Sequence, residues 1–205
     1  MFQEIRATID TAPGVLLDQA VQNLERMSLP GSRLADSEEQ YYRVVLNHMF
    51  DRRNIEFEQP IDLRRFLWVS VRLVNQWNLI VLPEQYRSKE REGLTPLREL
   101  EHVYRAFVDS LYERLQPDTD PEELAAWIEF EMVVRHCFFE AGPRQTSQAL
   151  VFWAMARYEH PLPRYASLLD PTAADLIHGW YTHQLSLDNP SWESWREKYL
   201  SAFFA

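Results

Sequence analysis

Apolar residues recur at helical spacing along nearly the whole chain. This is the period of an α-helix with one buried face, whereas a half-buried strand would alternate apolar and polar residues. The segment 54–61 alternates briefly, but it has no partner segment for a sheet and is interpreted as an extended connector. The pattern therefore predicts an all-α fold, a compact bundle of about eight helices.

Residues that cap or break helices separate the periodic segments. Proline falls mainly at these boundaries, and acidic or hydroxyl residues often stand where an N-terminal cap is needed. The longest polar run covers 83–94, which predicts an exposed loop. A short helical stretch over 1–12 precedes the predicted helices, which cover 15–28, 37–52, 63–82, 96–116, 120–141, 144–159, 171–187 and 191–204.

The most apolar predicted helix runs from about residue 120 to 141, and we expect the others to pack around it. Asp120 and Pro121 suit its first turn, while Gly142 followed by Pro143 suits its end. When its residues are placed at steps of about 100°, apolar side chains cover most of the circumference. A helix of this kind is usually buried on several sides.

Two groups of polar residues interrupt the apolar surface of this helix. Glu131 and Arg135 project into the apolar sector, one turn apart and in the favourable Glu-before-Arg order. We expect a structural ion pair there, with a polar anchor at the base of a pocket or partner groove as the alternative. The other group is a narrow stripe, interpreted as a solvated edge; it consists of Glu122, Glu129, His136 and Glu140.

The chain length is that of one good-sized domain, so residues 1–205 are predicted to form a single all-α domain. The alternative is a subdivision into N-terminal helices over 1–94 and C-terminal helices over 95–205. The segments that begin at Tyr42 and Tyr104 also share a pattern, and each precedes a long apolar helix. A true repeat of this kind would give stacked helical hairpins, a short solenoid.

Aromatic side chains form a stripe along the last predicted helix. If this helix folds back, the stripe caps the core; if it projects, it offers a face to a partner or to a second copy of the chain. The stripe consists of Trp192, Trp195, Tyr199, Phe203 and Phe204.

Composition limits the class of protein. Hydrophobic residues make up 46% of the chain and aromatic residues 13%, which supports a substantial core and excludes global disorder. The net charge of −10 disfavours extended contact with nucleic acid and would attract a basic partner. Basic residues are nearly all arginine, which we interpret as a bacterial or phage composition.

The single cysteine, Cys137, excludes an internal disulfide and is typical of a reducing compartment. It lies in an apolar sector of the central helix, which favours a structural role over a nucleophilic one. The first ten residues lack the apolar core of a signal peptide, and the apolar run 66–82 carries polar residues that argue against a membrane span. We therefore expect a cytoplasmic protein without a membrane segment.

Carboxylates and histidines with metal-ligand spacing form one candidate site. The sequence pairs Glu99 with His102, Asp175 with His178, and Glu129 with His136. Together these residues resemble haem-oxygenase-like dimetal oxidases, which combine a Glu/His pair with a later Asp-x-x-His. The resemblance implies a metal-dependent oxidase-like enzyme in a helical bundle, with a site formed by Glu129, His136, Asp175 and His178.

A second candidate site lies on the predicted helix 37–52. Arg43 and His48 stand there at the separation found in metal-independent helical ribonucleases of the HEPN type. The resemblance implies that this arginine and histidine would act on a scissile phosphate.

The sequence contains no glycine-rich phosphate loop, cysteine pair, nucleophile elbow or dinucleotide fingerprint. The absence of these motifs, the many aromatic residues and the acidic charge together favour a non-catalytic protein-binding or regulatory protein. It would be of the inhibitor, immunity or adaptor type, without a cofactor. Helix faces would dock to a protein partner, and a homo-oligomer is the alternative. The predicted contacts are Trp192, Trp195, Tyr199, Phe203, Glu131 and Arg135. The dimetal oxidase and the HEPN-like ribonuclease are the competing functions.

Overall fold

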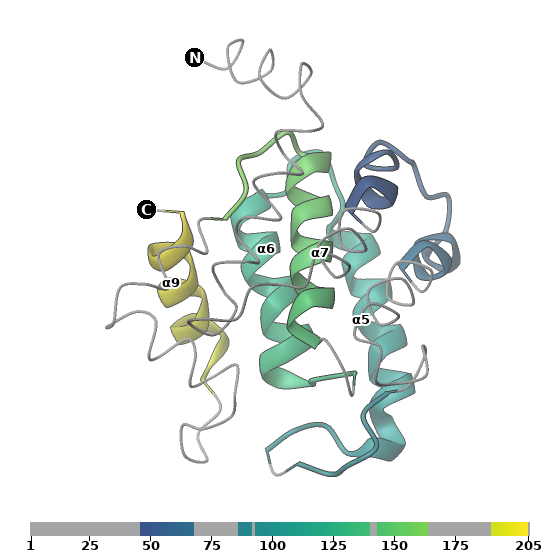
Figure 1. The fold of residues 1–205 in the computed structure, drawn as a ribbon, viewed down its shortest axis with the longest axis vertical. Coiled ribbons are helices and arrows are strands. Elements are labelled where there is room, and N and C mark those ends of the chain that lie inside the picture. Colours follow the sequence, from purple (N-terminus) through teal and green to yellow (C-terminus); the bar gives the residue numbers. More distant parts are fainter. Residues whose placement is uncertain (1–45, 68–85, 92, 140–142, 164–189, 205) are drawn as a thin grey trace, which may run out of the picture.

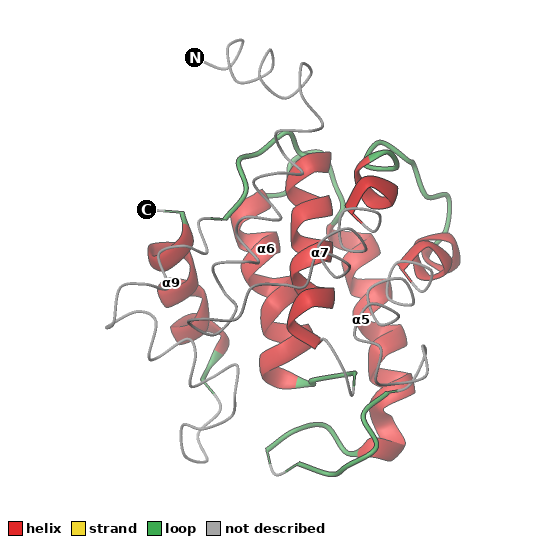
Figure 2. Cartoon of the chain, in the orientation of Figure 1, coloured by secondary structure: helices red, strands yellow, loops and turns green. Residues whose placement is uncertain are grey.

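A computed structural model describes residues 46–67, 86–91, 93–139, 143–163 and 190–204 of the chain. Within these ranges the protein is helical and contains no strand (Figure 2). An isolated antiparallel bridge between Tyr86 and Phe139 is the nearest approach to a sheet among the described residues. The predicted all-α class is confirmed.

Helices α6 and α7 lie side by side in the middle of the molecule, with α9 on one side and α5 on the other (Figure 1). Helical turns over 46–50 and 60–67 lie beyond α5. The elements are the 3-10 turn η1 (Leu97–Glu99), α5 (Leu100–Arg114), α6 (Pro121–Glu129), the π-helical segment η2 (Phe130–Arg135), α7 (Pro143–Arg157) and α9 (Trp192–Phe203).

The predicted start of the central helix is confirmed. The side chain of Asp120 accepts hydrogen bonds from the backbone N–H groups of Glu122 and Glu123, and Pro121 occupies the first turn. These contacts satisfy N–H groups that have no partner inside the helix. The last helix starts slightly later than the sequence suggested, because Ser191 is its N-cap and accepts from the N–H of Ser194.

The predicted end of the central helix, at residue 141, is wrong. The α-helical hydrogen bonding stops at Glu129, a π-helical segment follows, and the chain leaves the helix after Arg135. Cys137 then adopts a positive φ of 47°. A π-turn is wider than an α-turn, so a wheel drawn at α-helical steps misplaces every side chain beyond Phe130.

The core centres on the packed pair α6 and α7. Both helices are buried on nearly all sides, which the sequence predicted for the first of them only. In α7 the run from Val151 to Met155 is fully buried. Helix α5 joins this pair through Phe107, whose ring stacks on Trp127 at a centroid distance of 5.2 Å.

Helix α9 folds back and packs on α6, so its aromatic stripe caps the core. The side chains of Trp195, Tyr199 and Phe203 are fully buried. The indole Nε1–H of Trp195 donates to the carbonyl of Ala126 at 2.8 Å. The Tyr199 hydroxyl donates to the buried carboxylate of Glu129 at 3.0 Å. A buried polar group is costly without such a partner, and these two bonds fix the position of α9.

Several predictions concern other parts of the chain. The predicted helices over 15–28 and 171–187 lie outside the described residues, as does the start of the repeat segment, of which only 46–52 is described. The single domain over 1–205, its subdivision and the solenoid therefore stay predictions. No helix in the described ranges is both long and apolar enough to cross a bilayer.

Replacing Tyr199 with Phe tests the docking of α9. The change removes the hydroxyl that donates to Glu129 and leaves a buried carboxylate short of a partner, so we expect a loss of unfolding free energy of about 1–3 kcal/mol. Urea denaturation is the measurement. The matched control is Tyr158→Phe, whose hydroxyl donates to the Gln116 carbonyl near the surface. Equal effects of the two changes would contradict the argument.

Candidate active site at His136

His136 lies where the chain leaves η2 and turns towards α7. Its side chain is buried, with the residue only 7% exposed. The next residue, Cys137, has a left-handed backbone, which costs a non-glycine residue about 1–3 kcal/mol and occurs often at functional sites. In Figure 1 the start of α7 lies at the same end of the molecule as this loop.

Both ring nitrogens of His136 have hydrogen-bond partners. Nε2 lies 2.9 Å from Oε2 of Glu131, and Nδ1 lies 2.5 Å from the hydroxyl oxygen of Thr95. The other carboxylate oxygen of Glu131 accepts a hydrogen bond from Arg135 at 3.0 Å. The predicted ion pair between Glu131 and Arg135 is therefore present, and His136 joins it.

The π-helical segment explains how Glu131 meets His136. Residues five apart on an α-helix are separated by about 140° around the axis and do not face each other. In a π-helix hydrogen bonds join residues five apart, so such residues come round to the same side. Because η2 covers this stretch, Glu131 and His136 share a face.

The charge of Glu131 fixes the tautomer that we infer for His136. Burial acts to raise the pKa of Glu131, but the hydrogen bond from His136 and the charge of Arg135 outweigh it, so the pKa lies below its ordinary value. An ionised carboxylate can only accept hydrogen bonds. Nε2 therefore carries the proton, and the lone pair of Nδ1 faces the O–H of Thr95.

A hydroxyl, an imidazole and a carboxylate in this order form an arrangement for general-base chemistry. The imidazole can take the hydroxyl proton, and the carboxylate stabilises the imidazolium that results. The hydroxyl oxygen and Nδ1 are close enough for a proton to pass directly between them. Thr95, His136 and Glu131 are therefore the residues of the described structure that we consider capable of catalysis.

A loop over 86–95 lies against the His136 loop. The backbone N–H of Arg87 donates to the carbonyl of Phe138 at 2.9 Å, next to the bridge between Tyr86 and Phe139. The buried guanidinium of Arg87 also donates to the carbonyl of Thr95. This bond holds the threonine in place beside the imidazole.

The prediction of an exposed loop over 83–94 is only half right. Ser88, Lys89, Glu90 and Arg91 are exposed, whereas Arg87 and Leu94 are buried. The sequence did not reveal this because a polar run gives no sign of which arginine will find carbonyl partners. Arg91 also approaches the site, since its Nη1 lies 3.9 Å from the Cys137 sulfur. Arg87 and Arg91 thus lie beside the site, with the carboxylate of Glu90 3.8 Å from Arg87.

Aromatic rings form the inner wall of the site. The imidazole of His136 lies 5.0 Å from the ring of Phe138, which is fully buried. Phe138 in turn meets Tyr104 edge-on at 5.2 Å. The imidazole is thus packed against buried aromatic rings on this side.

The predicted solvated stripe on the central helix is wrong in two places. Glu129 is completely buried and accepts from Tyr199, and His136 is buried between Glu131 and Thr95. A carboxylate and an imidazole can be buried in these positions because other side chains form hydrogen bonds with them. Glu122 is half-buried, and Glu140 lies outside the described residues.

The proposed dimetal ligands do not gather within the described part of the chain. Glu129 and His136 make their hydrogen bonds to different groups, and Asp175 and His178 lie outside the described residues. In the ranges that the structure covers, no three His, Cys, Asp or Glu side chains are grouped to hold a metal ion. Glu99 and His102 are exposed on the surface.

The ribonuclease pair and the predicted partner contacts are also partly placed. Arg43 lies outside the described residues, and His48 stacks on Phe66 with ring centroids 6.1 Å apart. Burial lowers the pKa of His48, and the charge of Arg52 lowers it further. Trp192 is half-buried, while the other three aromatic contacts predicted on α9 are buried in the core. Their binding of a partner stays a prediction.

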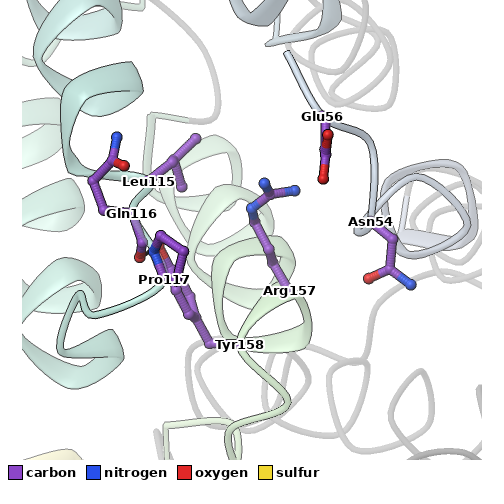
Figure 3. A pocket seen from close by; sticks show the side chains of 7 residues that line it. All are labelled: Asn54, Glu56, Leu115, Gln116, Pro117, Arg157 and Tyr158. Atoms are coloured by element: carbon purple, nitrogen blue, oxygen red, sulfur yellow. Dashed lines mark hydrogen bonds between the residues drawn. The ribbon is translucent and has the colours of Figure 1, made fainter. Parts of the chain in front are cut away.

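A separate pocket of about 330 Å³ lies near the end of α7 (Figure 3). The guanidinium of Arg157 points into it, between Glu56 and the turn at Pro117. Its Nη1 donates to the carbonyls of Arg53 and Ile55 at 2.8 and 2.7 Å. These bonds join the 53–55 turn to α7, so we assign Arg157 a structural role.

Comparison with known proteins adds one likeness of fold. No protein-family model and no curated protein matches the sequence. A solved structure of a Fic-domain-containing signalling protein from Bacteroides thetaiotaomicron VPI-5482 is similar, with a TM-score of 0.60 and 13% identity. The match covers 98% of this chain and 88% of that chain. At this identity the likeness shows a shared fold.

The prediction of a non-catalytic binding protein of the inhibitor, immunity or adaptor type is contradicted by this likeness. Fic proteins are typically enzymes or signalling proteins rather than plain binders. The prediction rested on the lack of a compact catalytic motif. The contacts of His136 form no compact sequence motif either, because its partners lie five and 41 positions away along the chain.

Replacing Glu131 with Gln tests the charge of the site. Because the pKa of Glu131 is depressed in the folded protein, its ionised form stabilises the fold above the ordinary value of 4.5, and this stabilisation is lost as the pH falls through the folded pKa. We expect the variant to lose about 1–3 kcal/mol at neutral pH and progressively less in acid. The measurement is the free energy of unfolding from chemical denaturation, at neutral pH and at a series of acidic pH values.

Glu101→Gln is the matched control for this change. Glu101 pairs with Arg105 at the same spacing, but both side chains are more than half exposed. An exposed pair of this kind contributes about 0.3–0.5 kcal/mol. A pH-independent difference between wild type and Glu131→Gln would show that the Glu131 carboxylate is not held ionised by its neighbours.

Proposed function

We propose that this protein is a group-transfer enzyme in which His136 is the general base that activates a hydroxyl group of an acceptor. The observation that carries the proposal is the orientation of His136, with the Nε2 side on ionised Glu131 and the Nδ1 side on a hydroxyl. A buried imidazole fixed in this way is prepared to accept one proton at one nitrogen.

The proposed reaction begins with removal of the acceptor proton by Nδ1 of His136. The acceptor oxygen then attacks the phosphorus of a phosphate-bearing donor, and the bond from that phosphorus to the leaving group breaks. Glu131 stays ionised and stabilises the imidazolium, while Arg135 holds Glu131 in place. General-base catalysis of this kind contributes about 10²–10⁴-fold to a rate.

Local positive charge supports a phosphate-bearing donor. Arg91 and Arg135 are exposed, and their guanidinium groups contact neighbours of His136: Arg91 contacts Cys137, and Arg135 contacts Glu131. Helix α7 begins at Pro143. Phosphates bind at helix N-termini and to arginine, because N–H groups and positive charge meet them there. With a net charge of −10 on the chain, such a patch would be needed to attract an anion.

The fold likeness supports a narrower choice of donor. Fic proteins are typically enzymes that attach AMP to other proteins, or signalling proteins. By analogy of fold, we propose that the transferred group is the adenylyl group of ATP and that the acceptor is a hydroxyl of a protein. Pyrophosphate would then be the leaving group. A role in signalling would follow from the modification of the acceptor.

His136→Asn tests the general base. Full-length protein is incubated with a bacterial lysate and ATP labelled at the α-phosphate, and labelled protein is measured. We expect the label transferred to fall by about 10²–10⁴-fold, since asparagine cannot accept the proton. The matched control is His102→Asn on the exposed side of α5, which should keep the wild-type level.

Two other outcomes would contradict the proposal. Equal labelling by wild type and His136→Asn would show that His136 is not the general base. Transfer of label from the γ-phosphate, without transfer from the α-phosphate, would indicate phosphoryl transfer and exclude the adenylyl group.

A further inference from the structure

We propose that the pocket near the end of α7 binds a free α-amino acid, with Arg157 holding the carboxylate of the ligand and Glu56 facing its ammonium group. The pocket lies at the end of α7 far from His136, so the inference does not depend on the proposed function. It adds a second ligand site. Its starting point is a pair of opposite charges that line one pocket without contacting each other.

The guanidinium of Arg157 has donors left for a ligand. Its Nη1 is used by the carbonyls of Arg53 and Ile55, whereas Nη2 and Nε make no hydrogen bond to a described residue. Figure 3 shows the guanidinium pointing into the pocket. Two N–H groups on one edge of a guanidinium match the two oxygens of a carboxylate. The structural bonds of Arg157 therefore leave one edge for an anionic group of a ligand.

The neighbours of Arg157 hold this edge in place. The central carbon of the guanidinium lies 6.0 Å from the ring centroid of Trp153, which is fully buried. The two carbonyls of the 53–55 turn hold the guanidinium through Nη1. A group that is already fixed loses little freedom when a ligand binds, which lowers the entropic cost of binding.

Glu56 supplies the opposite charge. Its side chain lines the same pocket, and no ion pair joins it to Arg157 or to another described residue. The chain is tied on both sides of Glu56, because the carbonyl of Ile55 accepts from Arg157 and that of Glu58 accepts from the hydroxyl of Tyr112 at 3.0 Å. The carboxylate and the guanidinium therefore share one space while they stay apart.

These two charges favour a ligand that carries both signs. Glu56 would repel a purely anionic ligand, and Arg157 would repel a purely cationic one. An α-amino acid bears a carboxylate and an ammonium group on one carbon atom, so it can meet both side chains at once. The pocket volume of about 330 Å³ is at the small end of the range for ligand sites, about 300–1,000 Å³, which suits a ligand of this size.

Apolar surfaces in the pocket favour an apolar side chain on the ligand. Leu115 and Pro117 follow α5, and Tyr158 follows α7. The hydroxyl of Tyr158 donates to the carbonyl of Gln116 at 2.8 Å, so the polar end of this side chain already has a partner. Its ring can therefore pack against an aliphatic group. We expect leucine to bind more tightly than glycine.

The test measures binding of L-leucine to the full chain by isothermal titration calorimetry. We expect one site per chain, and a higher melting temperature of the protein at saturating leucine. L-Leucinamide lacks the carboxylate and N-acetyl-L-leucine lacks the ammonium group, so each should bind about tenfold more weakly or worse. Glu56→Gln should weaken leucine binding by about tenfold or more for the same reason. The matched control is Glu58→Gln, an exposed glutamate nearby that does not line this pocket, which should match wild type.

Four other results would each overturn the inference. The first is no saturable binding of leucine, glycine or phenylalanine at millimolar concentration. The second is equal binding of leucine and its two derivatives, which would indicate apolar contact alone. The third is equal affinity of wild type and Glu56→Gln, and the fourth is an equal loss in Glu56→Gln and Glu58→Gln, which would indicate general surface charge.

Arg157→Lys tests the carboxylate end of the ligand. Lysine keeps the positive charge but lacks the planar edge of the guanidinium, so we expect leucine to bind about tenfold more weakly. Undiminished binding by this variant would contradict the role given to Arg157. If Arg157→Lys does not fold, because the bonds to the 53–55 turn are lost, the two leucine derivatives and Glu56→Gln decide.

Discussion

The carboxylate of Glu131 has lost most of its contact with water, so neighbouring side chains must supply the hydrogen bonds and opposite charge that water would have given. Arg135 takes one oxygen and His136 the other, so that both acceptor positions are used. A buried charge without such partners would cost several kcal/mol, and the group would then be protonated instead. The change from α- to π-helical winding over Phe130–Arg135 brings the histidine within reach. The π-helical winding and the pairing of the Glu131 carboxylate are therefore linked, because the first makes the second possible.

The same irregularity ends the helix and begins the loop that carries His136. After η2 the chain turns through the left-handed residue Cys137 and runs beside the 86–95 loop, to which it is joined by the bond between Arg87 and Phe138. Helices α6 and α7, which are largely buried and packed on each other, flank this part of the chain. Under the proposed function, a fixed orientation of His136 is what general-base chemistry requires.

Charge is distributed unevenly over the molecule. The chain carries a net charge of −10, yet Arg87, Arg91 and Arg135 cluster around His136. The overall acidity led us to predict no extended nucleic-acid contact, which stays a prediction, and it gave no information about a small local site. An anionic donor responds to the potential of the nearest side chains, because salt screens charges farther away than about 8–10 Å. The net charge of the chain therefore does not bear on the donor that we propose.

The amino-acid sequence by itself determined the helical class, the start of α6 at its Asp120 cap and the contact between Glu131 and Arg135. These features depend on spacing within one or two turns, which local hydrogen bonding and side-chain geometry decide. Tertiary structure decided the rest: the π-helical winding, the burial of Glu129 under Tyr199, the inward face of α9, and the approach of Thr95 to His136 from 41 residues away. A wheel drawn at α-helical steps could not show these features. The packing of α6 against α7 and α9 determines which buried polar groups must meet, and where the helix must widen so that they can do so.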